Sequence, residues 1–282
     1  MLNSIPKIGI MQGRLSEPTN NQIQSFPQDT WKSEFEKAHQ CGFQVLEWIF
    51  DDISNPLMNN SEIDEIILLS QKHNISINSV CADYFMNEKL FNVSDSELQK
   101  NFSILNDLII QCDKIGVKII EIPLVDSSSL QNKDNQNEFI QNLIAFLSKL
   151  SSNIIINLET DLPPVEFKTL LENFKDFDVY ANYDTGNSAS LGYSVDDEIS
   201  LLEPWLKNIH IKDRLYKGQT VPLGNGDANF ESFFLQLSKI HYDGDLIIQG
   251  ARNLLDTSLS PMDICTHYFD FVNQYVDKYL SR

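Results

Sequence analysis

The stretch KNIHIKDR, residues 207 to 214, alternates apolar and polar side chains like a β-strand and then presents a histidine, a lysine and an aspartate. Buried strands normally avoid such side chains, because an unpaired charge in a protein interior is costly. At the carboxyl end of a strand in a parallel barrel the same residues would reach an open mouth, where active sites are built. The stretch therefore suggests a barrel strand that ends at a functional site.

Seven other strand-like runs and eight segments with helical spacing of apolar residues alternate along the chain. The predicted strands are 7–13, 45–50, 76–82, 118–124, 154–159, 179–184, 209–213 and 246–251, and the predicted helices are 30–41, 61–73, 95–115, 135–150, 164–175, 195–203, 229–240 and 261–280. Eight β-then-α units predict one (β/α)8 TIM-barrel domain over residues 1–282. A doubly wound open sheet is the chief alternative, but GIMQGRL after the first strand lacks the GxGxxG phosphate loop.

Composition narrows the class of partner. The 282 residues carry a formal charge of -19, which would repel a nucleic-acid backbone and favours small-molecule ligands. Four cysteines lie scattered without CxxC pairs, which is typical of reduced, mostly buried thiols. The first residues lack a basic-then-apolar leader, and no run reaches the length of a membrane span. These features predict a cytoplasmic protein.

Four predicted strands place polar side chains near their carboxyl ends. Because side chains alternate between the two faces of a strand, Glu159, Asp184, His210 and Gln249 are expected to point inward at comparable heights. Each alone has a common structural explanation, such as a helix cap or a hydrogen-bonded core histidine. Together they predict a divalent-metal site, for which the oxygen-rich donor set favours Mn²⁺ or Mg²⁺, with Co²⁺ or Zn²⁺ also possible.

At these residues the sequence resembles the xylose isomerase-like barrels, in particular their sugar phosphate isomerase/epimerase branch, which includes ketose 3-epimerases and inosose dehydratases. The resemblance rests on INLE ending at Glu159, NYDTGN at 182–187, HIKD at 210–213 and VPLGNGDANF at 221–230. It implies that Glu159, Asp184 and His210 bind the metal with a fourth ligand from the last strand, and that Asn187 lies near the substrate. It also implies a sugar or sugar-phosphate substrate and homo-oligomers.

Further residues are candidates for substrate binding around the mouth: Gln12, Arg14, Glu47, Asn187, Asp213 and Arg252. A guanidinium that met the substrate would imply a phosphate or a carboxylate on it. The two arginines could equally form surface ion pairs in so acidic a protein, and Glu47 could be a charge satisfied within the barrel.

One position departs from the family pattern. The epimerase branch ends its eighth strand in a glutamate that serves as ligand and second base, whereas this chain has Gln249. An amide oxygen can coordinate a hard ion but cannot act as a base that accepts a proton. With Glu159 as the base, and Lys212 or Asp161 as the acid, one-base isomerisation or dehydration through an enediolate is favoured over two-base epimerisation.

Two other functions are compatible with the same fold. A metallophosphoesterase of the endonuclease kind needs several metals and many histidines, and only five histidines exist, of which His210 alone falls at a predicted strand end. A non-catalytic sugar-binding barrel would explain Gln249, but it would leave the three predicted metal ligands without a task. Neither displaces a sugar isomerase or epimerase of carbohydrate metabolism as the predicted function.

Overall fold

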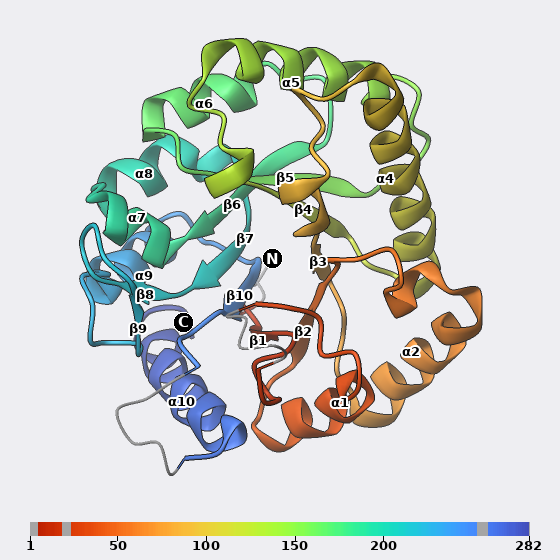
Figure 1. Ribbon diagram of the computed structural model, residues 1–282. Coiled ribbons are helices and arrows are strands. Elements are labelled where there is room, and N and C mark those ends of the chain that lie inside the picture. Colours follow the sequence, from red (N-terminus) through yellow and green to blue (C-terminus); the bar gives the residue numbers. More distant parts are fainter. Residues whose placement is uncertain (1–4, 19–23, 253–258, 282) are drawn as a thin grey trace.

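The computed structural model describes residues 5–18, 24–252 and 259–281, and its centre is a closed barrel of eight parallel strands (Figure 1). Around the barrel the strands follow the order β1-β10-β7-β6-β5-β4-β3-β2. Their bounds are β1 Ile8–Met11, β2 Val45–Ile49, β3 Ser79–Cys81, β4 Ile119–Leu124, β5 Ile155–Thr160, β6 Val179–Asp184, β7 Leu206–Ile211 and β10 Asp245–Ile248. The predicted (β/α)8 fold is confirmed.

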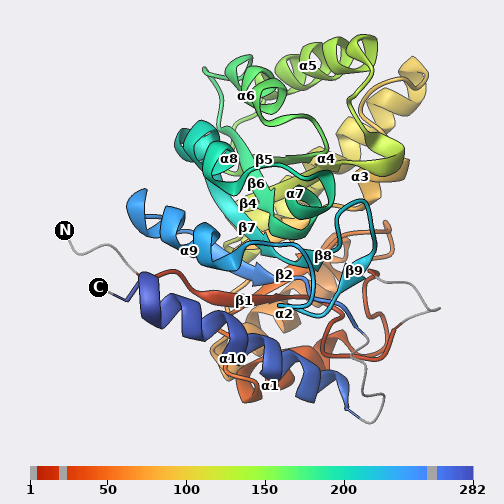
Figure 2. The ribbon, with the colours of Figure 1, turned by 90° about the vertical axis from the view of Figure 1, so that its left-hand side faces the viewer.

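Helices surround this barrel on its outer side (Figures 1 and 2). The α-helices are α1 Trp31–Gln40, α2 Asn60–His73, α3 Tyr84–Asn87, α4 Asp95–Ile115, α5 Lys133–Leu147, α6 Pro164–Glu172, α7 Thr185–Leu191, α8 Val195–Leu202, α9 Phe230–Lys239 and α10 Pro261–Tyr279. Short 3₁₀ turns lie at Pro56–Met58, Asp126–Ser128 and Glu203–Trp205. The one-domain prediction extends to residues 1–4 and 282, which lie outside the described residues.

Three local predictions need correction. The predicted helix over 61–73 begins at Asn60, because the side chain of Asn59 accepts the Ser61 N–H and caps α2. The predicted helix over 135–150 begins at Lys133, because Asn132 caps α5. The helix α7 was missed because its sequence, TGNSASL, is rich in residues of low helix propensity. Tertiary structure and caps at both ends stabilise it in place of propensity.

The strands bury different residue types on their two faces. In β4, Ile120, Ile122 and Leu124 are buried toward the helices, while Glu121 contacts His210 inside the barrel. Neighbouring strands repeat this pattern, because Glu121 pairs in register with Asn157, and Asp184 with His210. The apolar layer therefore lies between sheet and helices, and the barrel interior is polar toward its carboxyl end.

A small antiparallel pair extends the seventh unit beyond the barrel. β8 Asp213–Arg214 pairs with β9 Thr220–Val221, and this pair lies at the opposite end of the barrel from the C-terminal end of α10 (Figure 2). Its connection is tied to α7, because Lys217 donates its N–H to the Ser190 carbonyl at 2.8 Å. Strand β7 ends at Ile211, so Asp213 belongs to this hairpin and not to the barrel strand predicted over 209–213.

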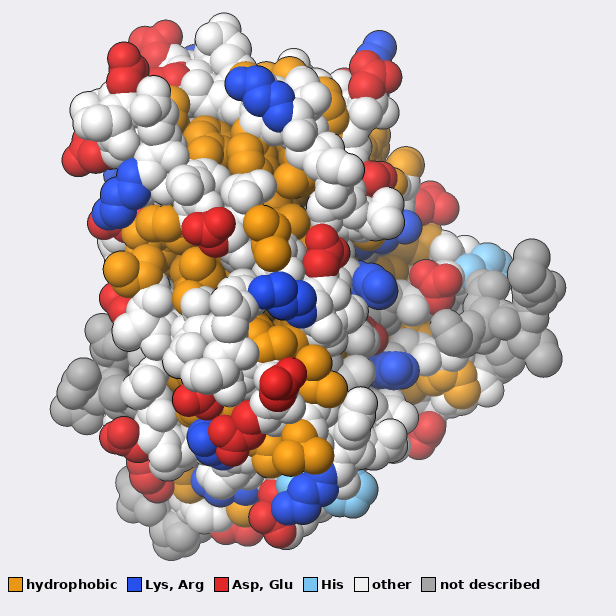
Figure 3. All heavy atoms as spheres, turned by 90° about the vertical axis from the view of Figure 1, so that its right-hand side faces the viewer, with side chains coloured by type: hydrophobic (Ala, Val, Ile, Leu, Met, Phe, Trp, Pro, Cys, Tyr) orange, Lys and Arg blue, Asp and Glu red, His pale blue; other side chains and the backbone are white. Residues whose placement is uncertain are grey.

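The outer surface carries apolar side chains on the side where α4 lies (Figure 3). A shallow groove of about 340 Å³ between α4 and α5 is lined by Leu98, Phe102, Phe146 and Leu150, among others. Homo-oligomerisation stays a prediction.

The four cysteines are buried free thiols, as expected. Among the described residues no helix combines the length and the apolar character that crossing a membrane requires.

Candidate active site

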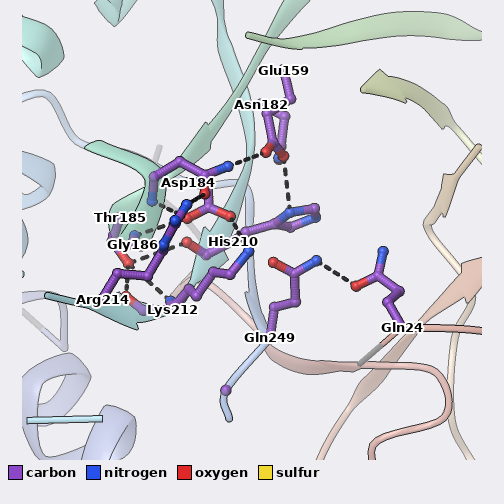
Figure 4. Close-up of polar contacts among 12 residues, drawn as sticks. Gln24, Glu159, Asn182, Asp184, Thr185, Gly186, His210, Lys212, Arg214 and Gln249 are labelled. Carbon is purple, nitrogen blue, oxygen red and sulfur yellow. Dashed lines mark hydrogen bonds and ion pairs between the residues drawn. The ribbon is translucent and has the colours of Figure 1, made fainter. Parts of the chain in front are cut away.

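Three of the four predicted metal ligands meet at the carboxyl ends of β5, β6 and β7. One ligand atom each from Glu159, Asp184 and His210 lies within 4.8 Å of the other two, and all three side chains are buried. Figure 4 shows them with Gln249, which arrives from the segment directly after β10. Neighbouring strands bring the side chains together because Asp184 pairs in register with His210, and Leu158 with Ala181.

Glu159 is held by two amides and a histidine. Its Oε2 accepts a hydrogen bond from Asn182 Nδ2 at 2.9 Å and lies 3.2 Å from His210 Nδ1, while its Oε1 accepts from Asn187 Nδ2 at 2.6 Å. Burial alone would raise the pKa of Glu159, but contact with His210 and the charge of Lys212 outweigh it and lower this pKa to about 2. The side chain is therefore a fixed carboxylate.

Asp184 has two tasks. Its Oδ1 accepts the N–H groups of Gly186 and Asn187, both at 2.8 Å, and so caps α7, whereas its Oδ2 lies 3.4 Å from Lys212 Nζ. The helix-cap role that Asp184 could have had instead of ligation thus occupies only one of its oxygens. A ligand atom of Asp184 still lies within 4.8 Å of ligand atoms of Glu159 and His210.

His210 links this cluster to deeper acids. Its Nε2 lies 2.6 Å from Glu47 Oε2 and 3.0 Å from Glu121 Oε2, on the side of the ring away from Glu159. Burial alone would lower the pKa of His210, but the charges of Glu121 and Glu47 raise it well above its usual value. These carboxylates fix the ring orientation, as carboxylates behind metal-binding histidines commonly do.

Gln249 faces the cluster with its oxygen. Its Nε2 donates to Gln24 Oε1 at 2.6 Å, while its Oε1 is buried without a hydrogen-bond partner (Figure 4). His210 Nδ1 likewise has no hydrogen-bond partner, although Glu159 is near. A divalent cation fits this arrangement, because it would displace the proton from His210 Nδ1, bind that nitrogen and the unpartnered Gln249 oxygen, and compensate the charge of the two carboxylates.

A cavity of about 680 Å³ opens above these residues. It is lined by Glu159, Gln249 and several other predicted site residues, namely Arg14, Asp161, Asn187 and Lys212. Asp161 sits at its side, where Ser129 Oγ and Gln131 Nε2 donate to its carboxylate. A volume of this size accommodates a small sugar or sugar phosphate.

The remaining predicted substrate-binding residues have partners within the protein. Gln12 Oε1 accepts the Ile49 N–H at 3.1 Å, and the guanidinium of Arg252 donates to the Gly13 carbonyl at 2.7 Å. Glu47 is fully buried below His210, where Ser79 Oγ and Asn208 Nδ2 also donate to it. These hydrogen bonds connect the segments around the site to one another. Direct contact of these residues with the substrate stays a prediction.

Asp213 organises the loop that follows β9. Its carboxylate accepts the N–H groups of Gly224, Gly226 and Ala228. Gly224 adopts a positive φ of +85°, which glycine tolerates best. Gly226 must lack a side chain, because a Cβ there would collide with the carboxylate of Asp213.

Several residues of the site escaped sequence analysis. Glu121 and Asn182 lie on inward faces of predicted strands, and a charged residue in the middle of KIIEIPL was a usable signal. Gln24 and Arg214 come from connecting segments, where no periodicity predicts a direction. Arg214 Nη1 donates to Asn187 Oδ1 at 3.0 Å and thereby reaches the site through the hairpin.

Comparison with known proteins agrees with this architecture. The family model described as "Xylose isomerase-like TIM barrel" matches residues 35–254. A curated Haemophilus influenzae protein, provisionally named an L-ribulose-5-phosphate 3-epimerase, is 25% identical over 238 residues, covering 78% of this chain and 83% of the relative. A Mycoplasma pneumoniae protein named a probable L-ribulose-5-phosphate 3-epimerase is 22% identical over 215 residues, or 72% of this chain and 70% of the relative.

Solved structures share the fold. An L-ribulose 3-epimerase superposes with a TM-score of 0.76 at 15% identity, over 97% of this chain and 95% of that one. The IOLI protein, whose crystal structure holds a zinc atom, gives a TM-score of 0.77 at 14% identity over 98% of this chain and 100% of that one.

Proposed function

Since the chain belongs to the xylose isomerase-like TIM barrel family, we propose that it is a divalent-metal-dependent epimerase of ketoses or ketose phosphates, acting at a carbon next to the carbonyl. The observation that carries the proposal is the convergence of Glu159, Asp184 and His210 within 4.8 Å, beside a 680 Å³ cavity that Glu159 itself lines. The names of the curated relatives support the choice of epimerisation over the isomerisation and dehydration that Gln249 alone favours.

The protein's own groups suit proton abstraction. Glu159, Asp184, His210 and the Gln249 amide oxygen would hold the ion. When bound, a divalent cation supplies Lewis-acid polarisation of the substrate carbonyl. Glu159 is a carboxylate fixed by Asn182 and Asn187, and it would take the proton from the neighbouring carbon to leave an enediolate on the substrate.

The cavity also suits an anionic end on the substrate. Arg14, Lys212 and Arg214 line it, from the segments that follow β1 and β7 and from the hairpin. Contacts within the protein already orient these three cations. Arg14 donates a hydrogen bond to the Gly250 carbonyl, Lys212 forms an ion pair with Asp184, and Arg214 donates to the Gly218 carbonyl. A phosphate would be stabilised by such groups, which favours a ketose phosphate over the free ketose.

Solvent-exchange spectroscopy tests this function. Purified protein is incubated in heavy water with Mn²⁺ and, separately, with L-ribulose 5-phosphate, L-ribulose and an inosose, and the products are followed by NMR and mass spectrometry. Epimerisation places deuterium at C3 of the epimer, aldose–ketose isomerisation places it at C1 or C2, and dehydration yields a product lighter by one water. A protein that retains Mn²⁺ and labels none of the three substrates would contradict the proposal.

A further inference from the structure

Epimerisation requires proton transfer on both faces of one carbon. Glu159 can serve one face, but the position directly after β10 that would serve the other holds Gln249, whose amide neither accepts nor supplies a proton at neutral pH. The candidate for the second group must therefore be a different acid, must line the same cavity, and must not already bind His210. Asp161 follows Glu159 by two residues on the same strand end and so reaches the same side of the cavity.

Asp83 lies at the right height in the barrel. Ser79, Cys81 and Asp83 follow one another with the period of two that keeps a strand's inward face, and Ser79 Oγ donates to Glu47 in the barrel interior. Cys81 pairs in register with Glu121 of β4, and two residues further along β4, Pro123 pairs with Glu159. The pairing continues past Cys81, since Ala82 donates its N–H to the Glu121 carbonyl at 2.9 Å.

This register places Asp83 level with Glu159, two strands away around the wall. With about 4.8 Å between neighbouring strands, the two backbones are roughly 10 Å apart, which leaves room for a substrate carbon between the side chains. Both residues line the 680 Å³ cavity. Glu121 lines it too, but it lies one inward position deeper and contacts His210 at 3.0 Å.

The side chain of Asp83 does not cap the helix that follows it. Asp83 precedes α3 at the N-cap position, where an aspartate normally accepts an N–H of the first turn, yet it makes no side-chain cap hydrogen bond. Its Oδ2 accepts from Gln24 Nε2 at 2.6 Å and its Oδ1 from the Cys81 thiol at 3.2 Å. Gln24 in turn accepts from Gln249 Nε2 at 2.6 Å.

We propose that Asp83 is the second proton-transfer group of the epimerase, joined to Gln249 through Gln24, so that Gln249 keeps the ligand role and Asp83 takes over the acid–base role. In one direction Glu159 removes the proton, the C–H electron pair passes into the enediolate, and the Asp83 carboxylic acid protonates the opposite face. The new C–H bond forms as the Asp83 O–H bond breaks, which leaves Asp83 ionised and Glu159 protonated. Exchange with solvent resets both groups, and the reverse reaction exchanges their roles.

The surroundings of Asp83 are consistent with this role. Burial raises the pKa of Asp83 above its usual value, although hydrogen bonds from Gln24 and Cys81 oppose the rise. The neighbouring Cys81 thiol stays protonated, because burial and then the charge of Asp83 raise its pKa well above the ordinary value. Cys81 can therefore orient the carboxyl but does not compete with it as a base.

The experiment follows exchange separately from the two epimers, and it rests on the proposed function. Asp83→Asn, Glu159→Gln and wild type, each with Mn²⁺, are incubated in heavy water with L-ribulose 5-phosphate and with its 3-epimer. We expect Asp83→Asn to lower epimer formation at least about 100-fold. It should still exchange the C3 proton of one recovered epimer, while Glu159→Gln exchanges that of the other. Asp83→Glu should restore part of the epimerisation.

Asp126→Asn is the matched control, because Asp126 is an exposed carboxylate at the rim of the same cavity. It should leave epimer formation and exchange unchanged. The Asp83 proposal fails if Asp83→Asn, folded by circular dichroism, forms epimer at the wild-type rate, exchanges both epimers or exchanges neither. If wild type itself labels neither epimer, the proposed function fails and this inference with it.

Discussion

Replacing Gln249 by glutamate should destabilise the metal-free protein but increase the stabilisation that a bound metal ion gives. Without metal, the change removes the donor of the 2.6 Å hydrogen bond to Gln24 Oε1 and leaves a carboxylate facing a carbonyl oxygen. It also adds a negative charge beside Glu159 and Asp184. A lost buried donor costs about 1–3 kcal/mol, so we expect a loss of about 2 kcal/mol. For a chain of 282 residues that lowers the melting temperature by roughly 3–4 °C.

With metal, the same substitution turns a neutral ligand into a charged one. An anionic oxygen in place of the amide should strengthen Mn²⁺ binding at least about tenfold, which equals about 1.4 kcal/mol. By linkage, saturating Mn²⁺ then stabilises Gln249→Glu more than wild type by that amount, or roughly 2–3 °C in the melting temperature. Calorimetric melting of metal-stripped protein, titrated with Mn²⁺, measures both effects.

The exposed Gln131 provides a control. Its Nε2 donates to Asp161 Oδ2 at 3.1 Å, so Gln131→Glu also replaces a donor to an acceptor oxygen by a negative charge, but away from the three-ligand cluster. Gln131→Glu should show the same Mn²⁺-induced rise in melting temperature as wild type. Equal shifts in wild type and Gln249→Glu would refute the placement of Gln249 among the ligands, and a more stable metal-free Gln249→Glu would refute the assigned hydrogen-bond direction.

Three further predictions concern the framework. Burial raises the pKa of Glu34 to about 7 in the folded state, so the free energy of unfolding should fall by up to about 3 kcal/mol as pH rises from about 4.5 to about 7. Urea unfolding of Glu34→Gln at several pH values should lack this loss. The same pH dependence of stability in wild type and Glu34→Gln would contradict the prediction. Gly9→Ala should cost about 1–3 kcal/mol in thermal unfolding, because its Cβ would lie 2.6 Å from Ile247 Cδ1; an unchanged melting temperature would show that the barrel relaxes there. Asp213→Ala should cost about 2 kcal/mol in urea unfolding through the N–H groups of residues 224–228, and no loss would mean that water replaces the carboxylate.

Much of the barrel and part of the site could be predicted because both follow from the periodic spacing of apolar and polar residues along strands and helices. Inward and outward faces alternate along each strand, so Glu159, Asp184 and His210 could be aligned before their distances were known. The missed helix α7 shows the limit of this approach. Its weak propensity is overcome by the Asp184 cap and by a left-handed Gly192 at its other end, and both caps depend on where β6 delivers the chain.

The sequence by itself determined the alternation of eight strands with helices, the polar strand ends, and the absence of a glutamate at position 249. These are local properties, because each depends on residues within a few positions of one another. Tertiary structure alone decided that Gln24 contacts Gln249, that Glu47 lies behind His210, and that Asp83 turns into the cavity without capping α3. The partners in the first two contacts are 225 and 163 residues apart, so barrel closure and register, which no local pattern encodes, bring them together.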